Sequence, residues 1–271
     1  VYRKVRNTSR YLLGNLHDFN PASDAIAVAD LPLLDRWMLQ RTAEVMDEIT
    51  EAFESYEFFR FFQLLQNFCV TDLSNFYLDI AKDRLYVSAP ADQRRRSCQT
   101  VMALIIERLA GFIAPVLCHM AEDIWQNLPY PVQETSVFQR GWPTIPSDWR
   151  NDTLSAPVQQ LRDLRAAVNK VLEDCRGRQE LGASLEAAVR IDARSPELQT
   201  ALSWLNDNGD PEVDGLRDWL LVSQLQLGGE PWAEVLASHE DNLALIEVSR
   251  ARGTKCERCW HYEGDVGQHP D

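Results

Sequence analysis

The chain has 271 residues, of which 45% are hydrophobic and 25% are charged, and its formal net charge is −14 at pH 7. This composition is typical of a folded globular protein and excludes a disordered or low-complexity chain. No apolar run reaches the roughly 18 to 20 residues that span a bilayer, so we expect a cytoplasmic protein without a membrane segment. The negative charge repels phosphates, so any contact with RNA must use a local basic patch.

Apolar residues at helical spacing predict a series of long helices in the first part of the chain. The expected helical segments are 1–19, 34–56, two within 57–86 and two within 92–128. Breaks are expected near 70–72 and at Gly111 or Pro115. Residues 129–151 hold four prolines and no periodic pattern, which predicts a linker. Long helices with short connections favour an antiparallel bundle.

The second part of the chain mixes helix and strand patterns. The expected elements are a helix at 154–176, a strand at 185–191, a helix at 195–205, and strands at 220–227 and 243–248. Ser195 followed by Pro196 is typical of a helix cap and a first helical residue. These elements predict a small α+β domain.

The expected fold class is therefore mainly α, with an antiparallel helical bundle followed by a small α+β domain. A truncated zinc tail, which contains the cysteine pair described below, follows them. The expected domains are 1–150 including the linker, 151–250, and 251–271. The chain begins with Val1 inside an amphipathic pattern and stops within a metal-type motif. Both ends indicate a piece of a longer protein.

The first helix carries a candidate surface for RNA. Its first seventeen residues hold four basic side chains and no acid. Arg3, Arg6 and Arg10 share one flank of the helix, and Asn7 lies beside them. Arg and Lys hold phosphates, and planar side chains stack on unpaired bases. The alternative is a solvated face whose arginines pair with acids of neighbouring helices.

Two other basic segments give weaker signals. Lys82 and Arg84 are mixed with acids, and Asp79 lies three residues before Lys82, so a surface ion pair is the simpler interpretation there. The arginines at 94–96 lie near a helix start, where cations are not favoured, and a solvated loop is simpler than a phosphate site. Neither segment predicts RNA binding by itself.

Cys256 and Cys259 have the C-x-x-C spacing of half a zinc site. No cysteine follows them, so we expect the other two ligands beyond residue 271. Two alternatives stay open: a site completed by His261 or His269, and a redox motif. The remaining cysteines lie inside helical patterns and are expected to be buried thiols: Cys69, Cys98, Cys118 and Cys175.

Several strings of the sequence resemble bacterial isoleucyl-tRNA synthetases in their order and approximate spacing. They are "YRKVRNTSRYLLGNLHDF", "LDRWMLQ", "FYLDIAKDRLY", "RRSCQTVM", "IAPVLCHMAEDIW", "VNKVLEDCR", "LGASLEAAV" and "KCERCWHY". The resemblance covers nearly the whole chain. Valyl and leucyl enzymes are similar in the helical part, but "FYLDIAKDRLY" together with "KCERCW" resembles the isoleucine type.

This resemblance implies the C-terminal part of such an enzyme, with a class I anticodon-binding bundle, a junction domain and the start of a zinc-binding tail. The implied function is recognition of the tRNA anticodon arm within an isoleucine–tRNA ligase, which attaches isoleucine to its tRNA using ATP and magnesium. The class I signature motifs of the His-Ile-Gly-His and Lys-Met-Ser-Lys-Ser types are absent from the chain. The chain alone is therefore not expected to be catalytic.

The resemblance also implies particular site residues. Those expected to contact tRNA are Arg3, Arg6, Asn7, Arg10, Lys82 and Arg84. Cys256 and Cys259 match the first pair of a four-cysteine zinc site. The expected partners are isoleucine tRNA and the catalytic and editing domains of the same polypeptide, in a monomer.

A second functional hypothesis is a helical protein-interaction domain with a structural metal tail and no RNA role. The salt dependence of RNA affinity separates the two, because contacts to several phosphates give a steep slope.

Overall fold

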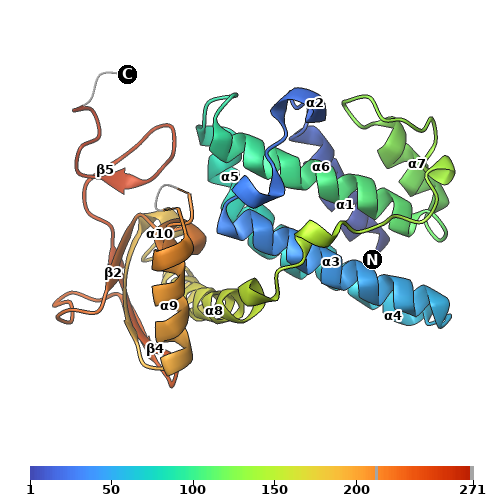
Figure 1. Cartoon of the computed structure of the whole chain (residues 1–271). Helices are drawn as coiled ribbons and strands as arrows, with labels where there is room; N and C mark the ends of the chain where they lie inside the picture. The colour runs from blue at the N-terminus through green and yellow to red at the C-terminus, as the bar shows by residue number, and fades with distance from the viewer. Residues whose placement is uncertain (211–212, 269–271) are drawn as a thin grey trace. The chain divides into compact units, whose positions relative to one another are not determined.

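The computed structural model describes residues 1–210 and 213–268 (Figure 1). The chain separates into two compact units, Val1–Asp152 and Thr153–Asp271. Within the described ranges, no helix combines the length and the apolar character needed to cross a bilayer. A helical bundle followed by an α+β unit confirms the fold class expected from the sequence. The finer division into 1–150, 151–250 and 251–271 stays a prediction.

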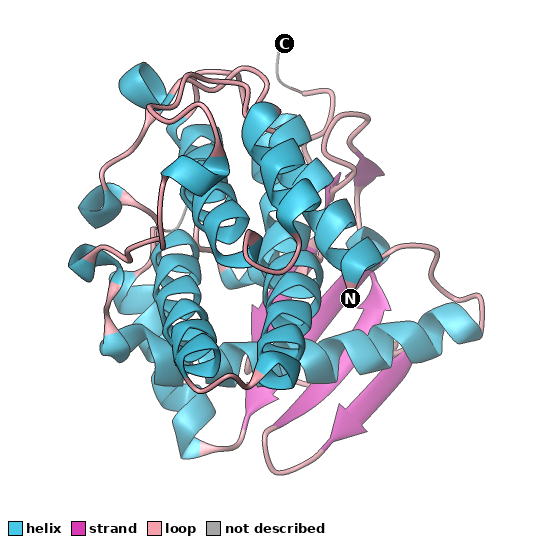
Figure 2. Ribbon diagram, turned by 90° about the vertical axis from the view of Figure 1, so that its right-hand side faces the viewer, coloured by secondary structure: helices cyan, strands magenta, loops and turns pink. Residues whose placement is uncertain are grey.

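The first unit is built mainly from helices. They are α1 (Tyr2–Gly14), α2 (Pro21–Asp24), α3 (Leu33–Glu54), α4 (Phe58–Asn67), the π-helix η2 (Phe68–Tyr77), α5 (Leu78–Val87), α6 (Gln93–Ile113) and α7 (Cys118–Gln126), with 3-10 turns η1 (Val28–Asp30), η3 (Val137–Gln139) and η4 (Ser147–Trp149). Helices α1, α3 and α5 all contact α6, and α4 turns back along α3 (Figures 1 and 2). The core is filled by fully buried apolar side chains such as Leu12, Met38, Met46, Leu65 and Ile106.

The chain does not break near residues 70–72, so that prediction is wrong. It continues from α4 to α5 through the π-helix η2, in which the turns are wider than in an α-helix. Ser74 Oγ donates to the Cys69 carbonyl at 2.7 Å, which occupies an acceptor inside this wider turn. The chain therefore forms one continuous helical rod from Phe58 to Val87.

Gly111 lies inside α6 and does not break it. Its helix runs on to Ile113, and only then does the chain turn toward α7. A Cβ atom at Gly111 would lie 2.3 Å from Cγ of Pro143, in the segment predicted as a linker. Glycine is needed here because that segment packs directly against the helix backbone.

The second unit contains a four-stranded mixed sheet with strand order β2-β1-β4-β3. Its elements are α8 (Ser155–Gly177), η6 (Ser184–Glu186), β1 (Ala187–Ala193), α9 (Pro196–Asn208), α10 (Leu216–Leu220), β2 (Gln224–Leu227), β3 (Ala237–Glu240) and β4 (Ala244–Arg250), followed by the short hairpin β5 (Thr254–Lys255) and β6 (Tyr262–Glu263). Helices α8 and α9 pack against each other and against the sheet. The predicted cap of α9 is confirmed, because Ser195 Oγ accepts from the Leu198 N–H at 3.1 Å.

The strand expected at 220–227 is only half present. Leu220 ends the short helix α10, and Leu221 then adopts a left-handed backbone with φ of 55° before β2 begins. The edge strand β3 was not predicted, because its four residues "ASHE" carry little apolar signal. It pairs antiparallel with β4 through contacts that a local pattern does not reveal.

Candidate nucleic-acid interface

The basic residues of α1 form an exposed strip. We define the α1 strip as Arg3, Arg6, Asn7 and Arg10, all of which face solvent while the opposite side of the helix is buried. Within residues 1–210 and 213–268, no acidic side chain lies at ion-pair distance from the three arginines. The alternative in which they pair with neighbouring helices therefore does not hold. Their guanidinium groups can bind phosphate without first breaking an intramolecular pair.

The buried side of α1 is fixed to the π-helix by polar contacts. Thr8 Oγ1 lies 3.2 Å from Ser74 Oγ and donates to the Cys69 carbonyl at 3.4 Å. One turn further on, the hydroxyl of Tyr86 on α5 donates to that of Tyr11 at 3.2 Å. These contacts fix the rotation of α1 about its axis, and hence the direction of the α1 strip.

Lys82 lies exposed on α5, where the predicted pair with Asp79 is confirmed at 2.6 Å. The side chains of this pair are 52% and 31% exposed, so the contact is weak and easily exchanged for another anion. Tyr86 lies one helical turn after Lys82 and is 61% exposed. Tyr86 was not predicted as a site residue, although its spacing of four residues from Lys82 places both on one face of a helix.

Arg84 does not join this surface. Its side chain is buried, and its guanidinium pairs with Asp35, with Nη1 to Oδ2 at 2.6 Å. The prediction that Arg84 contacts tRNA disagrees with this position, because a ligand could reach the group only after the core opened. Lys82 and Arg84 belong to one short motif, yet only Lys82 is available to a partner.

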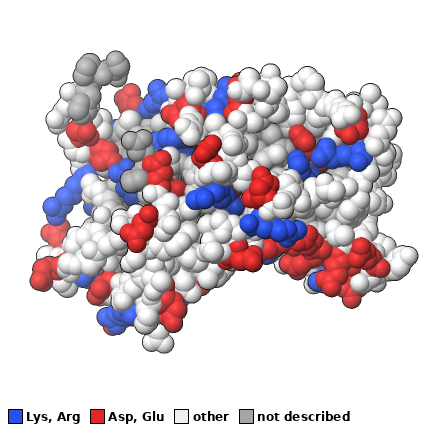
Figure 3. All heavy atoms as spheres, in the orientation of Figure 1, with Lys and Arg blue, Asp and Glu red and all other residues white. Residues whose placement is uncertain are grey.

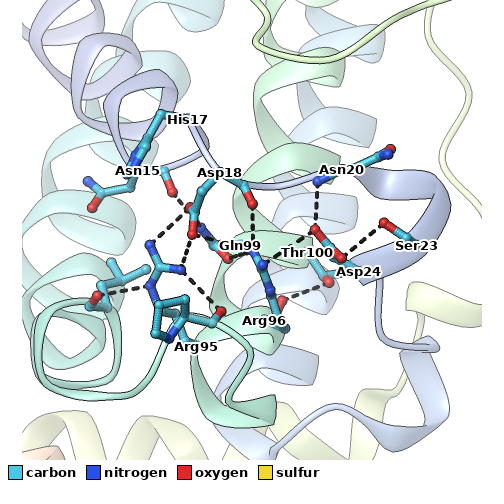
Figure 4. A network of polar contacts seen from close by, with 12 residues as sticks. Asn15, His17, Asp18, Asn20, Ser23, Asp24, Arg95, Arg96, Gln99 and Thr100 are labelled. Carbon is cyan, nitrogen blue, oxygen red and sulfur yellow. Dashed lines mark hydrogen bonds and ion pairs between the residues drawn. The ribbon is translucent and has the colours of Figure 1, made fainter.

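The arginines at 94–96 do not form a solvated loop. Arg95 pairs with Asp18, and Arg96 Nη1 donates to the Asp18 carbonyl at 2.9 Å (Figure 4). Gln99 Nε2 also donates to the Asp18 carboxylate at 2.8 Å. Chiefly through the hydrogen bond from Arg95, this arrangement lowers the pKa of Asp18 to about 2. The network attaches the chain just after α1 to α6. Arg95 and Arg96 therefore help to hold in place the helix that carries the α1 strip.

Cys256 and Cys259 lie in a tight turn between β5 and β6. The Trp260 N–H donates to the Cys256 carbonyl at 3.0 Å, and Trp260 has a left-handed backbone with φ of 65°. Hydrogen bonds from the backbone N–H groups of Cys259 and Arg258 lower the pKa of the Cys256 thiol. Stabilising the thiolate in this way favours the form that binds metal.

This turn fits one half of a tetrahedral thiolate site. Within residues 1–210 and 213–268, no three side chains of His, Cys, Asp or Glu come together to hold a metal ion. His261 is buried and does not join the two thiols in such a group, and His269 lies outside the described residues. Cys69, Cys98 and Cys175 are buried as expected, whereas Cys118 is exposed at the start of α7.

Comparison with known proteins assigns the class. Residues 35–191, more than half of the chain, match the family described as "Anticodon-binding domain of tRNA ligase", and the chain belongs to this family. The matched range includes Lys82 and begins after the α1 strip.

The chain is similar to isoleucine–tRNA ligases. It is 97% identical over 271 residues to that of Parasynechococcus marenigrum (strain WH8102) and 76% identical over 271 residues to that of Synechococcus sp. (strain CC9311), in both cases over 100% of this chain. It is 54% identical over 266 residues, or 98% of the chain, to that of Prochlorococcus marinus (strain MIT 9301). The chain spans 28% of the length of each of these relatives.

Proposed function

We propose that this chain is the tRNA-recognition module of an isoleucine–tRNA ligase. The helical unit holds the anticodon arm, so that the tRNA presents its other end to a catalytic domain elsewhere in the same polypeptide. That catalytic domain attaches isoleucine to the tRNA with ATP and magnesium, in the cytoplasm. The module contributes to the reaction by positioning the tRNA rather than by making bonds.

The observation that carries this proposal is the α1 strip. Three arginines and an amide lie in one exposed row on α1, and none of the three arginines is in an ion pair within the part of the chain that the structure describes. Such a row of exposed cations favours phosphate. Lys82 and the exposed ring of Tyr86 lie on α5, which the Tyr11 contact joins to α1. An exposed ring beside basic groups suits an unpaired base.

Binding to an isoleucine-tRNA anticodon stem-loop, measured at three salt concentrations, tests this function. A stem-loop with altered anticodon bases serves as the comparison. We expect tighter binding of the cognate loop and a steep loss of affinity with salt, because several phosphate contacts release counterions. No binding of either loop by folded protein would favour the second hypothesis, a helical protein-interaction domain with a structural metal tail and no RNA role.

We also propose that the full-length protein binds one zinc ion through Cys256 and Cys259. The Cys256 thiolate is stabilised by the turn, and zinc needs four ligands in a structural site. The other two ligands come from residues outside this chain. When bound, zinc would supply a structural link and no reaction step.

Elemental analysis after dialysis tests the zinc proposal. Full-length protein should retain one zinc per chain, and Cys256→Ser or Cys259→Ser should lose it. The chain of 271 residues alone should retain little, because two thiolates give up most of the roughly 10 to 16 kcal/mol of a complete site. Stoichiometric zinc in the short chain would contradict this and implicate His261 or His269.

A further inference from the structure

The turn between α3 and α4 exposes three large aromatic rings. We name Tyr56, Phe58 and Phe59 the aromatic tip; they are 80%, 45% and 76% exposed. Single exposed apolar side chains are ordinary, but three within four residues form a patch, and patches of this kind mark interaction surfaces. The tip lies at the end of the helical hairpin formed by α3 and α4 (Figure 1).

The aromatic tip rests on a rigid support. The ring of Phe53 lies 5.8 Å from that of Phe58 and 5.1 Å from that of Trp142, measured between centroids. Trp142 in turn lies 4.9 Å from Phe112 of α6, and its indole N–H donates to Thr50 Oγ1 at 3.1 Å. This ladder of rings reaches the core, so it supports Phe58 and, through a ring contact of 6.3 Å, Tyr56.

Tyr56 occupies a backbone position that the end of α3 requires but that tyrosine does not favour. Its φ is 59°, a left-handed value that bulky residues rarely adopt. The Glu57 N–H donates to the Ala52 carbonyl at 2.7 Å, and the Tyr56 N–H donates to the Phe53 carbonyl at 3.1 Å. This is the Schellman ending of a helix, where glycine is the favoured residue. Tyrosine is less favourable than glycine at this position, and its ring, 80% exposed, adds little to the core.

The surroundings of the aromatic tip favour a protein partner over RNA. Glu51, Glu54 and Glu57 are exposed beside it. Arg60, the one cation within residues 51–60, forms ion pairs with Glu51 at 2.9 Å and with Glu57 at 3.3 Å. Figure 3 shows carboxylates gathered along α3 on this side of the first unit. A negative surface repels phosphates but attracts an apolar surface that is bordered by Lys or Arg.

We propose that the aromatic tip docks onto another part of the full-length ligase polypeptide, outside these 271 residues. The chain spans 28% of the length of its relatives, so a full-length protein offers a large surface within the same molecule. The docking surface is apolar at its centre and basic at its border. This inference rests on the proposed function, because it takes the chain to be part of such a ligase.

Photo-crosslinking in the full-length ligase tests the docking. The photoreactive residue p-benzoylphenylalanine replaces Tyr56 or Phe59, and a matched control places it at Phe138, which is also exposed. Without tRNA, positions 56 and 59 should give intramolecular crosslinks to peptides outside residues 1–271, at least several-fold above position 138. The variant Tyr56→Gly suits the left-handed backbone and keeps the fold, and it should lower the crosslink yield from position 59 several-fold.

Four results would overturn the proposal: crosslinks from the tip to tRNA alone in a second sample to which tRNA is added, crosslinks to a second copy in isotope-mixed samples, crosslinks to residues 153–268, or no crosslinks above the control. The same preparations are assayed for anticodon stem-loop binding. If the crosslinks are absent while salt-sensitive RNA binding is retained, only the docking is refuted. Crosslinks without any RNA binding refute only the proposed function.

Discussion

Asp35 and Arg84 form an ion pair whose side chains are 0% and 4% exposed. The hydroxyl of Tyr77 donates to Asp35 at 2.5 Å, and burial raises the pKa of Tyr77 well above its usual value, so this hydroxyl remains a donor. The three residues come from α3, η2 and α5, so the cluster joins the helices that carry Lys82 and support α1. In the proposed function, the part of this cluster is to hold these helices in position.

Replacing Arg84 by Met should destabilise the first unit by about 3 to 5 kcal/mol, because it leaves the Asp35 carboxylate buried without its partner. Urea unfolding measures the change. The control is Lys82→Met, two residues away and exposed, for which the cost should stay under about 1 kcal/mol. Equal costs for the two variants would refute a structural role specific to Arg84.

Asp18 should make folding stability depend on pH in acid. Its pKa is about 2 in the folded protein and 3.8 in the unconstrained residue, mainly because Arg95 donates to its carboxylate. The stabilisation is therefore complete above pH 4 and is lost as the pH falls from about 4 to about 2. Chemical unfolding of wild type and Asp18→Asn should show a stability difference at pH 6 that shrinks by pH 2.5. A difference independent of pH would exclude this carboxylate as its source.

At the scale of elements, α6 contacts the segment that contains Pro143, and this contact depends on Gly111. Gly111→Ala would gain about 1 kcal/mol in helix propensity, but it places a methyl group within 2.3 Å of the Pro143 ring. Overpacking of this kind costs about 1 to 3 kcal/mol, and the short distance places this site at the upper end. We expect a net loss of stability in thermal or urea unfolding.

The control for Gly111 is Gly14→Ala, at the last residue of α1, where a Cβ would meet no atom within 4 Å. That variant should be neutral or slightly stabilising. If both alanine variants gained stability, Pro143 would have room to move, and the close contact would not constrain the helix.

For the whole molecule, Arg6→Ala or Arg10→Ala in the full-length ligase should weaken tRNA binding and leave isoleucyl-adenylate formation unchanged. Each variant removes about one phosphate contact, so the slope of log affinity against log salt should decrease by about one. Filter binding over a salt series measures the slope, and pyrophosphate exchange measures adenylate formation. Equal loss of both activities would indicate a folding defect instead.

Local chemistry was enough to predict much of the molecule. The period of 3.6 residues placed Arg3, Arg6 and Arg10 on one face of a helix, and Ser195 before Pro196 specified a cap. Such features depend on residues close in sequence, so they can be read without knowing the fold. The spacing of Cys256 and Cys259 likewise predicts half of a zinc site, and this stays a prediction.

Tertiary structure decided which of these residues are available. Lys82 and Arg84 are equally basic in sequence, and only the folded structure buries Arg84 against Asp35 and leaves Lys82 exposed. The π-helix, the edge strand β3 and the contact of Gly111 with Pro143 also depend on segments that meet only after folding. Periodicity defines the faces of an element, but burial depends on what each face meets, and that is set by long-range packing.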